Sequence, residues 1–142
     1  MQKEKVTIIT GTVGEDSHTI GVSLLSLFLK EHGFNVVELR GLNPPEDFID
    51  AAKETDAVAI LISSLYGMGE MDLKGFKEKC IEAGLEDVLL YVGGYLNIGR
   101  HDWQEDETIF KNLQFDRVYP PEVDLENVLK DLTEDLTEKG RL

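Results

Sequence analysis

Apolar positions along the chain alternate between short continuous runs and stripes with helical spacing. Short runs rich in β-branched residues predict five strands, at 6–10, 35–39, 56–63, 87–92 and 117–119. Helical spacing of apolar residues predicts five helices, at 20–31, from Pro45 onward, and at 71–83, 103–113 and 125–136. Because residues 57–62 are apolar throughout, we expect the third strand to be central and covered on both faces.

This alternation of strands and helices predicts an α/β fold. Parallel strands require crossover connections, so the order of elements favours a doubly wound five-stranded parallel sheet, flavodoxin-like or Rossmann-like, with strand order 2-1-3-4-5. We interpret residues 1–142 as a single domain, because two halves would each be too small for a stable core. Ligands of such sheets bind beyond the carboxyl ends of the strands, here the loops at 11–20, 63–70, 93–101 and 119–122.

Charge and composition narrow the possible partners. Twenty-eight acidic residues against 14 basic ones give a formal net charge of −14, so we expect neither nucleic acid nor a membrane surface as a partner. The acidic surface is interpreted as solvated, with an acidic docking face as the alternative. No secretory signal or membrane-spanning run is recognisable, and the single cysteine, Cys80, excludes an internal disulfide. The predicted location is therefore cytoplasmic.

The loop at 11–20 carries a possible metal ligand. Its glycines do not form a GxGxxG dinucleotide motif, and it lacks the lysine of a P-loop. The remaining feature is Asp16-x-His18, followed by Gly21. A histidine near a carboxylate suits metal ligation, because one ring nitrogen binds the metal while the other donates to the carboxylate. An isolated surface histidine is the alternative interpretation of this pair.

The next two loops combine hydroxyl groups with glycines. Ser63 and Ser64 offer hydroxyls to a polar ligand at the end of the third strand, and Gly67 allows close approach of the backbone. Gly93 and Gly94 remove side chains where a bulky group could pass along the sheet. A helix N-terminus and a simple glycine-rich turn are the respective alternatives.

Taken together, these loops resemble a known signature. DxHxxG at 16–21, SxL at 63–65 and GG at 93–94 are similar to the cobalamin-binding motifs of base-off, histidine-on enzymes. The stretches at 63–70, 79–86, 89–94 and 116–119 resemble the small (sigma) subunits of glutamate mutases, also called methylaspartate mutases. The likeness covers nearly the whole chain.

The resemblance implies adenosylcobalamin as the cofactor. It makes His18 the lower axial ligand of cobalt, with Asp16 bonded to the far ring nitrogen of His18. The other cofactor-binding residues that it implies lie along the nucleotide tail, its lid or the lower edge of the corrin: Glu15, Ser17, Thr19, Gly21, Ser63, Ser64, Leu65, Gly67, Gly93, Gly94, Tyr95, Leu96, Asn97, Ile98 and Gly99.

The resemblance also implies a reaction and a partner. The reaction is the radical interconversion of L-glutamate and threo-3-methyl-L-aspartate by an isomerase (an intramolecular transferase). A large barrel (epsilon) subunit would bind L-glutamate, in a complex of two small and two large chains. This chain would contain no catalytic residue of its own and would be inactive alone. The alternatives are a stand-alone cobalamin carrier or sensor, or the corrinoid subunit of another mutase or of a methyltransferase.

Overall fold

The computed structural model describes most of the chain, and the fold is taken from that part. The described ranges are residues 6–13, 20–40, 43–64, 73–94, 103–120 and 124–142, with only the backbone described at 20, 21 and 103. Expectations that fall on other residues lie outside the described residues.

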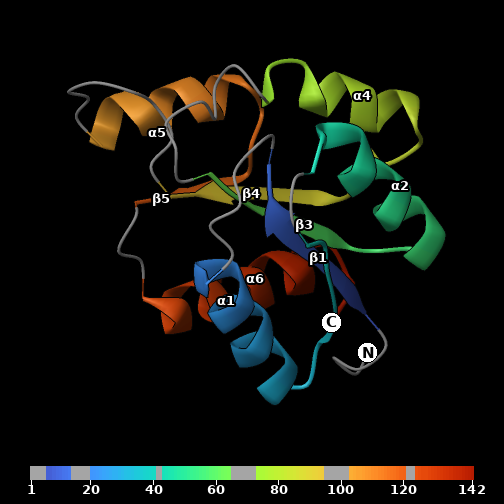
Figure 1. Ribbon diagram of the computed structural model, residues 1–142, viewed down its shortest axis with the longest axis vertical. Helices are drawn as coiled ribbons and strands as arrows, with labels where there is room; N and C mark the ends of the chain where they lie inside the picture. Colours follow the sequence, from blue (N-terminus) through green and yellow to red (C-terminus); the bar gives the residue numbers. More distant parts are fainter. Residues whose placement is uncertain (1–5, 14–19, 41–42, 65–72, 95–102, 121–123) are drawn as a thin grey trace.

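Five strands form one parallel sheet (Figure 1). They are β1 (Thr7–Thr12), β2 (Asn35–Glu38), β3 (Ala59–Ser63), β4 (Leu89–Gly93) and β5 (Arg117–Tyr119). The sheet order is β2-β1-β3-β4-β5, and every neighbouring pair is parallel. The predicted fold class and strand order are therefore confirmed.

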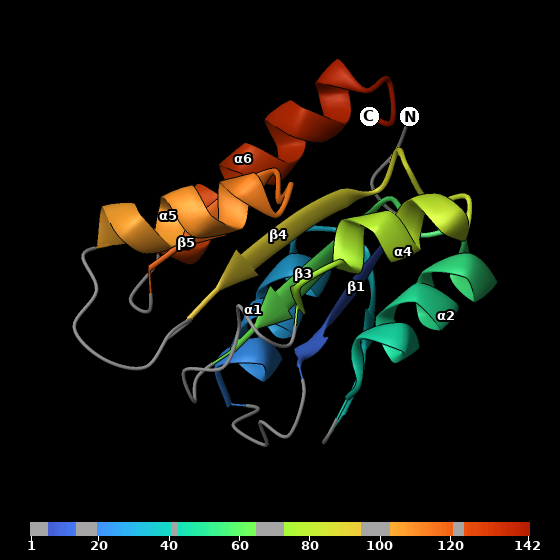
Figure 2. The same ribbon diagram turned by 90° about the horizontal axis from the view of Figure 1, so that it is seen from above.

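Helices cover both faces of this sheet. In the described part of the chain they are α1 (Ile20–Glu31), α2 (Pro45–Thr55), α4 (Phe76–Glu82), α5 (Trp103–Asn112) and α6 (Leu125–Glu138). Figures 1 and 2 show α2, α4 and α5 on one face of the sheet and α1 and α6 on the other. None of these helices combines the length and the apolar character needed to cross a lipid bilayer.

The apolar run of the third predicted strand explains why two cores form. Side chains alternate between the faces of a strand, so Ile60 and Ile62 pack in the core beneath α2, α4 and α5. Ala59 and Leu61 pack in the second core, beneath α1 and α6. All four side chains are buried, as expected for a central strand.

One helix predicted as continuous is interrupted by a turn. The prediction of one continuous helix over 71–83 is wrong, because residues 74–75 form a turn between the helical Leu73 and α4, which begins at Phe76; residues 71–72 lie outside the described ones. Gly75 precedes α4 with φ of 79°, a left-handed conformation that breaks a right-handed helix. Apolar spacing does not register such a break, since Leu73, Phe76 and Cys80 are all buried in the same core.

Helix α6 packs the C-terminal part of the chain against the sheet. Asp124 caps its first turn by accepting a hydrogen bond of 3.0 Å from the amide of Glu126. Val128, Leu132 and Leu136, spaced four residues apart, are buried against the sheet. The predicted surface helix is therefore confirmed, with one apolar face buried.

Candidate functional site

The carboxyl ends of four strands lie level with one another. The register pairs Thr12 with Ser63, Ser63 with Gly93, and Gly93 with Tyr119. The hydrogen bonding continues one residue further. The amide of Val13 donates to the carbonyl of Ser63 (3.1 Å), and the amide of Ser64 donates to the carbonyl of Gly93 (3.0 Å). Strand ends predicted to carry the site therefore share one edge of the sheet.

A cavity of about 340 Å³ opens at this edge, between the sheet and helices α1 and α6. Ser63, Gly93 and Gly94 line it at the strand ends. Its other walls are mainly apolar and come from α1, the strands, the segment after β5 and α6: Val22, Leu24, Leu25, Leu61, Ile62, Tyr91, Val92, Tyr119, Pro120, Leu125 and Val128. This volume lies at the lower end of the range of about 300–1,000 Å³ typical of small-molecule pockets. An apolar cavity with few polar groups suits a largely apolar ligand group.

Gly93 and Gly94, both predicted to contact the cofactor, are glycines for different structural reasons. A β-carbon on Gly93 would lie 3.3 Å from Cβ of Tyr119, which is tighter than ordinary packing, and 3.5 Å from the carbonyl oxygen of the same residue, an ordinary contact. Gly94 has φ of 102°, in a region that other residues rarely adopt. Gly93 therefore allows β5 to approach β4, and both glycines leave the cavity open at this end of the sheet.

The two predicted serines differ in environment. Ser63 is partly exposed and lies on the cavity wall. Ser64 is fully buried, is not among the wall residues, and its hydroxyl has no hydrogen-bond partner in the described part of the chain. Since buried hydroxyls are nearly always hydrogen-bonded, the Ser64 hydroxyl fits a site that also receives polar groups of a ligand.

Helix α1 is held on the sheet by a buried polar contact. Thr10 on β1 and Ser26 on α1 share a hydrogen bond of 2.8 Å between their hydroxyls. Ser26 also donates to the carbonyl of Val22, itself a wall residue of the cavity. This contact positions the α1 side of the cavity relative to β1.

Most of the predicted cofactor contacts lie outside the described residues. This applies to Glu15, Asp16, Ser17, His18, Thr19, Leu65, Gly67, Tyr95, Leu96, Asn97, Ile98 and Gly99. Gly21 is described by its backbone alone, in the first turn of α1. The predicted residues that the structure brings together are Ser63, Ser64, Gly93 and Gly94. The proposed cobalt ligand and its carboxylate partner stay predictions.

Two tyrosines line the cavity, although the sequence predicted no binding role for either of them. Tyr91 is buried inside β4, and Tyr119 is the last residue of β5. Their rings are 5.8 Å apart between centroids and tilted by 61°, an edge-to-face contact on the cavity wall. Two signals in the sequence point to them: the stretches 89–94 and 116–119, which resemble the sigma subunits, contain both tyrosines, and the predicted ligand loop at 119–122 begins at Tyr119.

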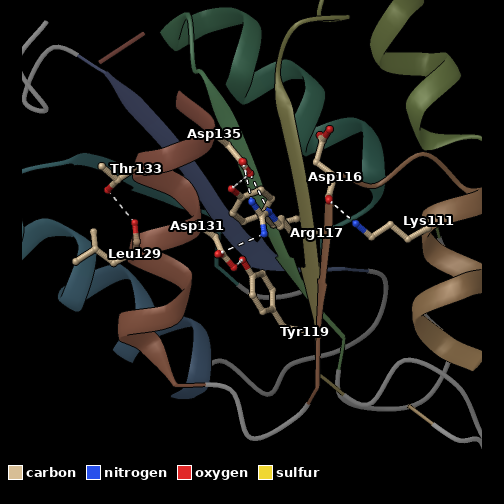
Figure 3. Close-up of polar contacts among 9 residues, drawn as sticks. Lys111, Asp116, Arg117, Tyr119, Leu129, Asp131, Thr133 and Asp135 are labelled. Carbon is tan, nitrogen blue, oxygen red and sulfur yellow. Dashed lines mark hydrogen bonds and ion pairs between the residues drawn. The ribbon is translucent and has the colours of Figure 1, made fainter. Parts of the chain in front are cut away.

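A charged network holds both tyrosine hydroxyls; Figure 3 labels Tyr119, Arg117 and the two aspartates of this network. Tyr91 donates to Asp135 Oδ2 at 2.5 Å, and Tyr119 donates to Asp131 Oδ2 at 2.8 Å. Arg117 reaches from β5 toward α6, where the two aspartates lie one helical turn apart. Its Nε and Nη2 donate to Asp135 at 3.0 and 2.9 Å, and its Nη1 lies 3.4 Å from Asp131 Oδ1. We call these five residues the tyrosine–aspartate network.

The network keeps its phenols neutral and its Asp135 carboxylate charged. Burial acts to raise the pKa of Asp135, but hydrogen bonds from Arg117 and Tyr91 outweigh it and hold that pKa below its usual range. Burial raises the pKa of both Tyr91 and Tyr119, and their hydrogen bonds to aspartate raise it further. The hydroxyls therefore act as hydrogen-bond donors over the whole physiological pH range.

A doubly wound parallel sheet with a cavity beyond its strand ends defines the class of α/β ligand-binding domains. The family model of the B12 binding domain matches residues 6–110. The chain is 51% identical over 136 residues to the glutamate mutase sigma subunit of Clostridium tetani, covering 96% of this chain and 99% of that protein. It is 50% identical over 133 residues to the sigma subunit of Clostridium cochlearium, covering 91% and 97% of the two chains. The chain belongs to the B12 binding domain family and, within it, to the glutamate mutase sigma subunits.

Solved structures with low sequence identity share the fold. A cobalamin-binding protein from Desulfitobacterium hafniense superposes with a TM-score of 0.74 at 18% identity, over 92% of this chain and 58% of that one. The monomethylamine corrinoid protein of Methanosarcina barkeri gives 0.73 at 21% identity, over 93% of this chain and 58% of that one. This chain thus spans less than two thirds of those solved chains, although it spans nearly all of the sigma subunits.

Proposed function

We propose that this chain binds adenosylcobalamin with the nucleotide tail detached from cobalt and inserted into the cavity. The observation that carries the proposal is the cavity itself, lined by Ser63, Gly93 and Gly94, in a member of the B12 binding domain family. Its apolar walls suit an aromatic base, and Ser63 on the wall offers its hydroxyl to the sugar or the base. In this proposal Ser64, whose hydroxyl is buried off the wall, contacts the tail once the tail is inserted. The tail would keep water out of the space between α1, α6 and the sheet.

The cobalt would be held by His18. In this proposal Asp16 accepts a hydrogen bond from the ring nitrogen that does not bind the metal, which leaves the ligating nitrogen unprotonated. Family membership and the DxHxxG motif support these roles. The remaining residues proposed to contact the tail or the corrin are Glu15, Ser17, Thr19, Gly21, Leu65, Gly67, Tyr95, Leu96, Asn97, Ile98 and Gly99.

We propose that the chain works as one part of glutamate mutase. When bound, adenosylcobalamin supplies the radical chemistry by which L-glutamate and threo-3-methyl-L-aspartate are interconverted. The residues of this chain bind the cofactor, orient it and shield its lower side. A large barrel (epsilon) subunit encloses the upper side and binds glutamate, in a complex of two small and two large chains. The sigma-subunit names of its relatives support such a partner. The cytoplasmic location stays a prediction.

The metal ligand can be tested by spectroscopy of the purified chain. Co(II) cobalamin bound to chain labelled with ¹⁵N-histidine should show a nitrogen splitting that differs from that of unlabelled chain. His18→Ala should lose this isotope effect, whereas the control His32→Ala, an exposed residue near the end of α1, should retain it. An isotope effect that persists in His18→Ala, or that is missing from the wild-type chain, would refute histidine ligation through residue 18.

The carboxylate and the partner need separate tests. Asp16→Asn should weaken cobalamin binding about 10- to 100-fold, as loss of a group that orients a ligand does elsewhere; unchanged affinity would contradict its role. The chain with adenosylcobalamin and glutamate should yield no methylaspartate until a large subunit of glutamate mutase is added. A chain that binds cobalamin but stays inactive with such a subunit would instead be a stand-alone carrier.

A further inference from the structure

We infer that Tyr119, held in place by Asp131, is a specificity-determining residue of the cavity and sets which base it accepts at the end of a corrinoid tail. This inference rests on the proposed function, because it concerns the group that enters the cavity. Asp131 lies outside the stretches that resemble the sigma subunits, and Tyr119 ends one of them, at 116–119, without a predicted role in binding.

The ring of Tyr119 is fixed at both of its ends. At the backbone end, β5 pairs with β4 so closely that a β-carbon on Gly93 would lie only 3.3 Å from Cβ of Tyr119. At the other end, the hydroxyl donates to Asp131 at 2.8 Å. The edge-to-face contact with the fully buried ring of Tyr91 also restricts sideways movement of the Tyr119 ring. The ring therefore forms a wall that is already in place before a ligand arrives.

The same network sets the width of the cavity. Helix α6 contributes Leu125 and Val128 to the wall opposite the sheet, and it also carries Asp131. Arg117 on β5 binds both aspartates of α6, so it ties the helix to the strand that carries Tyr119. The distance between these two walls thus depends on polar bonds outside the cavity.

Stability alone does not account for this arrangement. The side chain of Asp131 is 22% exposed and that of Arg117 is 35% exposed. Ion pairs in such partly exposed positions contribute little to folding. The contact with Asp131 instead orients the ring of Tyr119, which lines a cavity with the volume of a ligand pocket.

A fixed wall discriminates between bases by shape. In apolar pockets, one methyl or methylene group changes affinity by about 10-fold or more when the walls cannot adjust. We therefore expect the wild-type chain to prefer cobalamin, whose base carries two methyl groups, over the cobamide with unsubstituted benzimidazole. A variant whose cavity wall can move should lose part of this preference for cobalamin.

The experiment measures the affinity of the full-length chain for three corrinoids: cobalamin, benzimidazolyl cobamide and cobinamide, which has no tail base. The variants are Tyr119→Phe, which keeps the ring but loses the hydroxyl, and Asp131→Asn. Glu134→Gln, an exposed position on α6, is the control for charge. Tyr119→Phe should reduce the preference for cobalamin over benzimidazolyl cobamide about 5- to 10-fold. Asp131→Asn should act in the same direction, and cobinamide binding should stay unchanged in all variants.

The outcomes separate this inference from the proposed function. Wild-type chain that does not bind cobalamin more tightly than cobinamide would overturn both. A wild-type preference for the tail that neither Tyr119→Phe nor Asp131→Asn alters would overturn the inference alone. Equal weakening of all three corrinoids would also overturn it, because that is the effect of a purely structural contact.

Discussion

Replacing Asp135 by alanine would remove the acceptor that two residues of the sheet share. The hydroxyl of Tyr91 and the guanidinium of Arg117 both donate to this carboxylate. Tyr91 is buried and has no room to turn toward water, since its ring also packs against that of Tyr119. The substitution therefore leaves a buried donor without its partner in the network.

The expected magnitude follows from the burial of each group. A buried hydroxyl that loses its acceptor costs about 1–3 kcal/mol. The ion pair with Arg117 adds no more than about 1 kcal/mol, because the arginine side chain is 35% exposed and water screens the pair. We expect Asp135→Ala to lower the free energy of unfolding by about 2–3 kcal/mol at neutral pH.

Urea unfolding in a double-mutant cycle tests this reasoning. In chain that already carries Tyr91→Phe, no buried donor is left, so Asp135→Ala should cost about 1–2 kcal/mol less than it does in the wild-type chain. The same cost in both backgrounds would show that the Tyr91–Asp135 contact does not stabilise the fold. A loss below about 0.5 kcal/mol in the wild-type chain would refute the burial argument itself.

The pH dependence supplies a second check. Hydrogen bonds from Arg117 and Tyr91 outweigh burial and lower the pKa of Asp135 in the folded chain. Its contribution to stability is therefore complete above the ordinary pKa of about 3.9 and is lost as pH falls through the lowered folded value. The difference between the wild-type chain and Asp135→Ala should be constant from about pH 5 to 8 and should shrink below about pH 4. A difference that stays constant into the acid range would contradict the lowered pKa.

Three further outcomes follow from buried groups. Because burial and then hydrogen bonds to aspartate raise the pKa of Tyr91 and Tyr119, their stabilising contribution is present below about pH 10 and lost above it. Tyrosinate absorbance should show two phenols that ionise only on unfolding; smooth titration of all four tyrosines in the folded chain would contradict this. Burial raises the pKa of the Cys80 thiol to about 11, and the charge of a nearby lysine opposes this only slightly. Ellman's reagent at pH 8 should therefore react with this thiol only after denaturation. Gly11→Ala would place a β-carbon 3.0 Å from Cε1 of Phe48. It should lower the free energy of unfolding, measured in urea, by about 1–3 kcal/mol. Unchanged stability would show that the Phe48 ring can move aside.

The helices and strands were predictable because their signals are local. A run such as 57–62 has to be covered on both faces, and only a central strand between two layers of helices provides that. The start of α4 was not predictable from spacing, because Gly75 changes the backbone direction without changing which side chains are buried. The position of Ser63, Gly93 and Gly94 at one edge of the sheet was predictable because strand ends are visible in the sequence, and parallel strands bring these ends together.

By itself, the sequence determined the α/β class, the strand order, the edge of the sheet at which the cavity opens, and the family. Only the tertiary structure decided that Tyr91 and Tyr119 share a wall with helix α6 and that Arg117 joins that helix to β5. The physical reason is the range of the interactions. Hydrophobic periodicity is set by neighbours within one or two turns, whereas these contacts join residues 12 to 44 positions apart, and they depend on how α6 packs across the sheet.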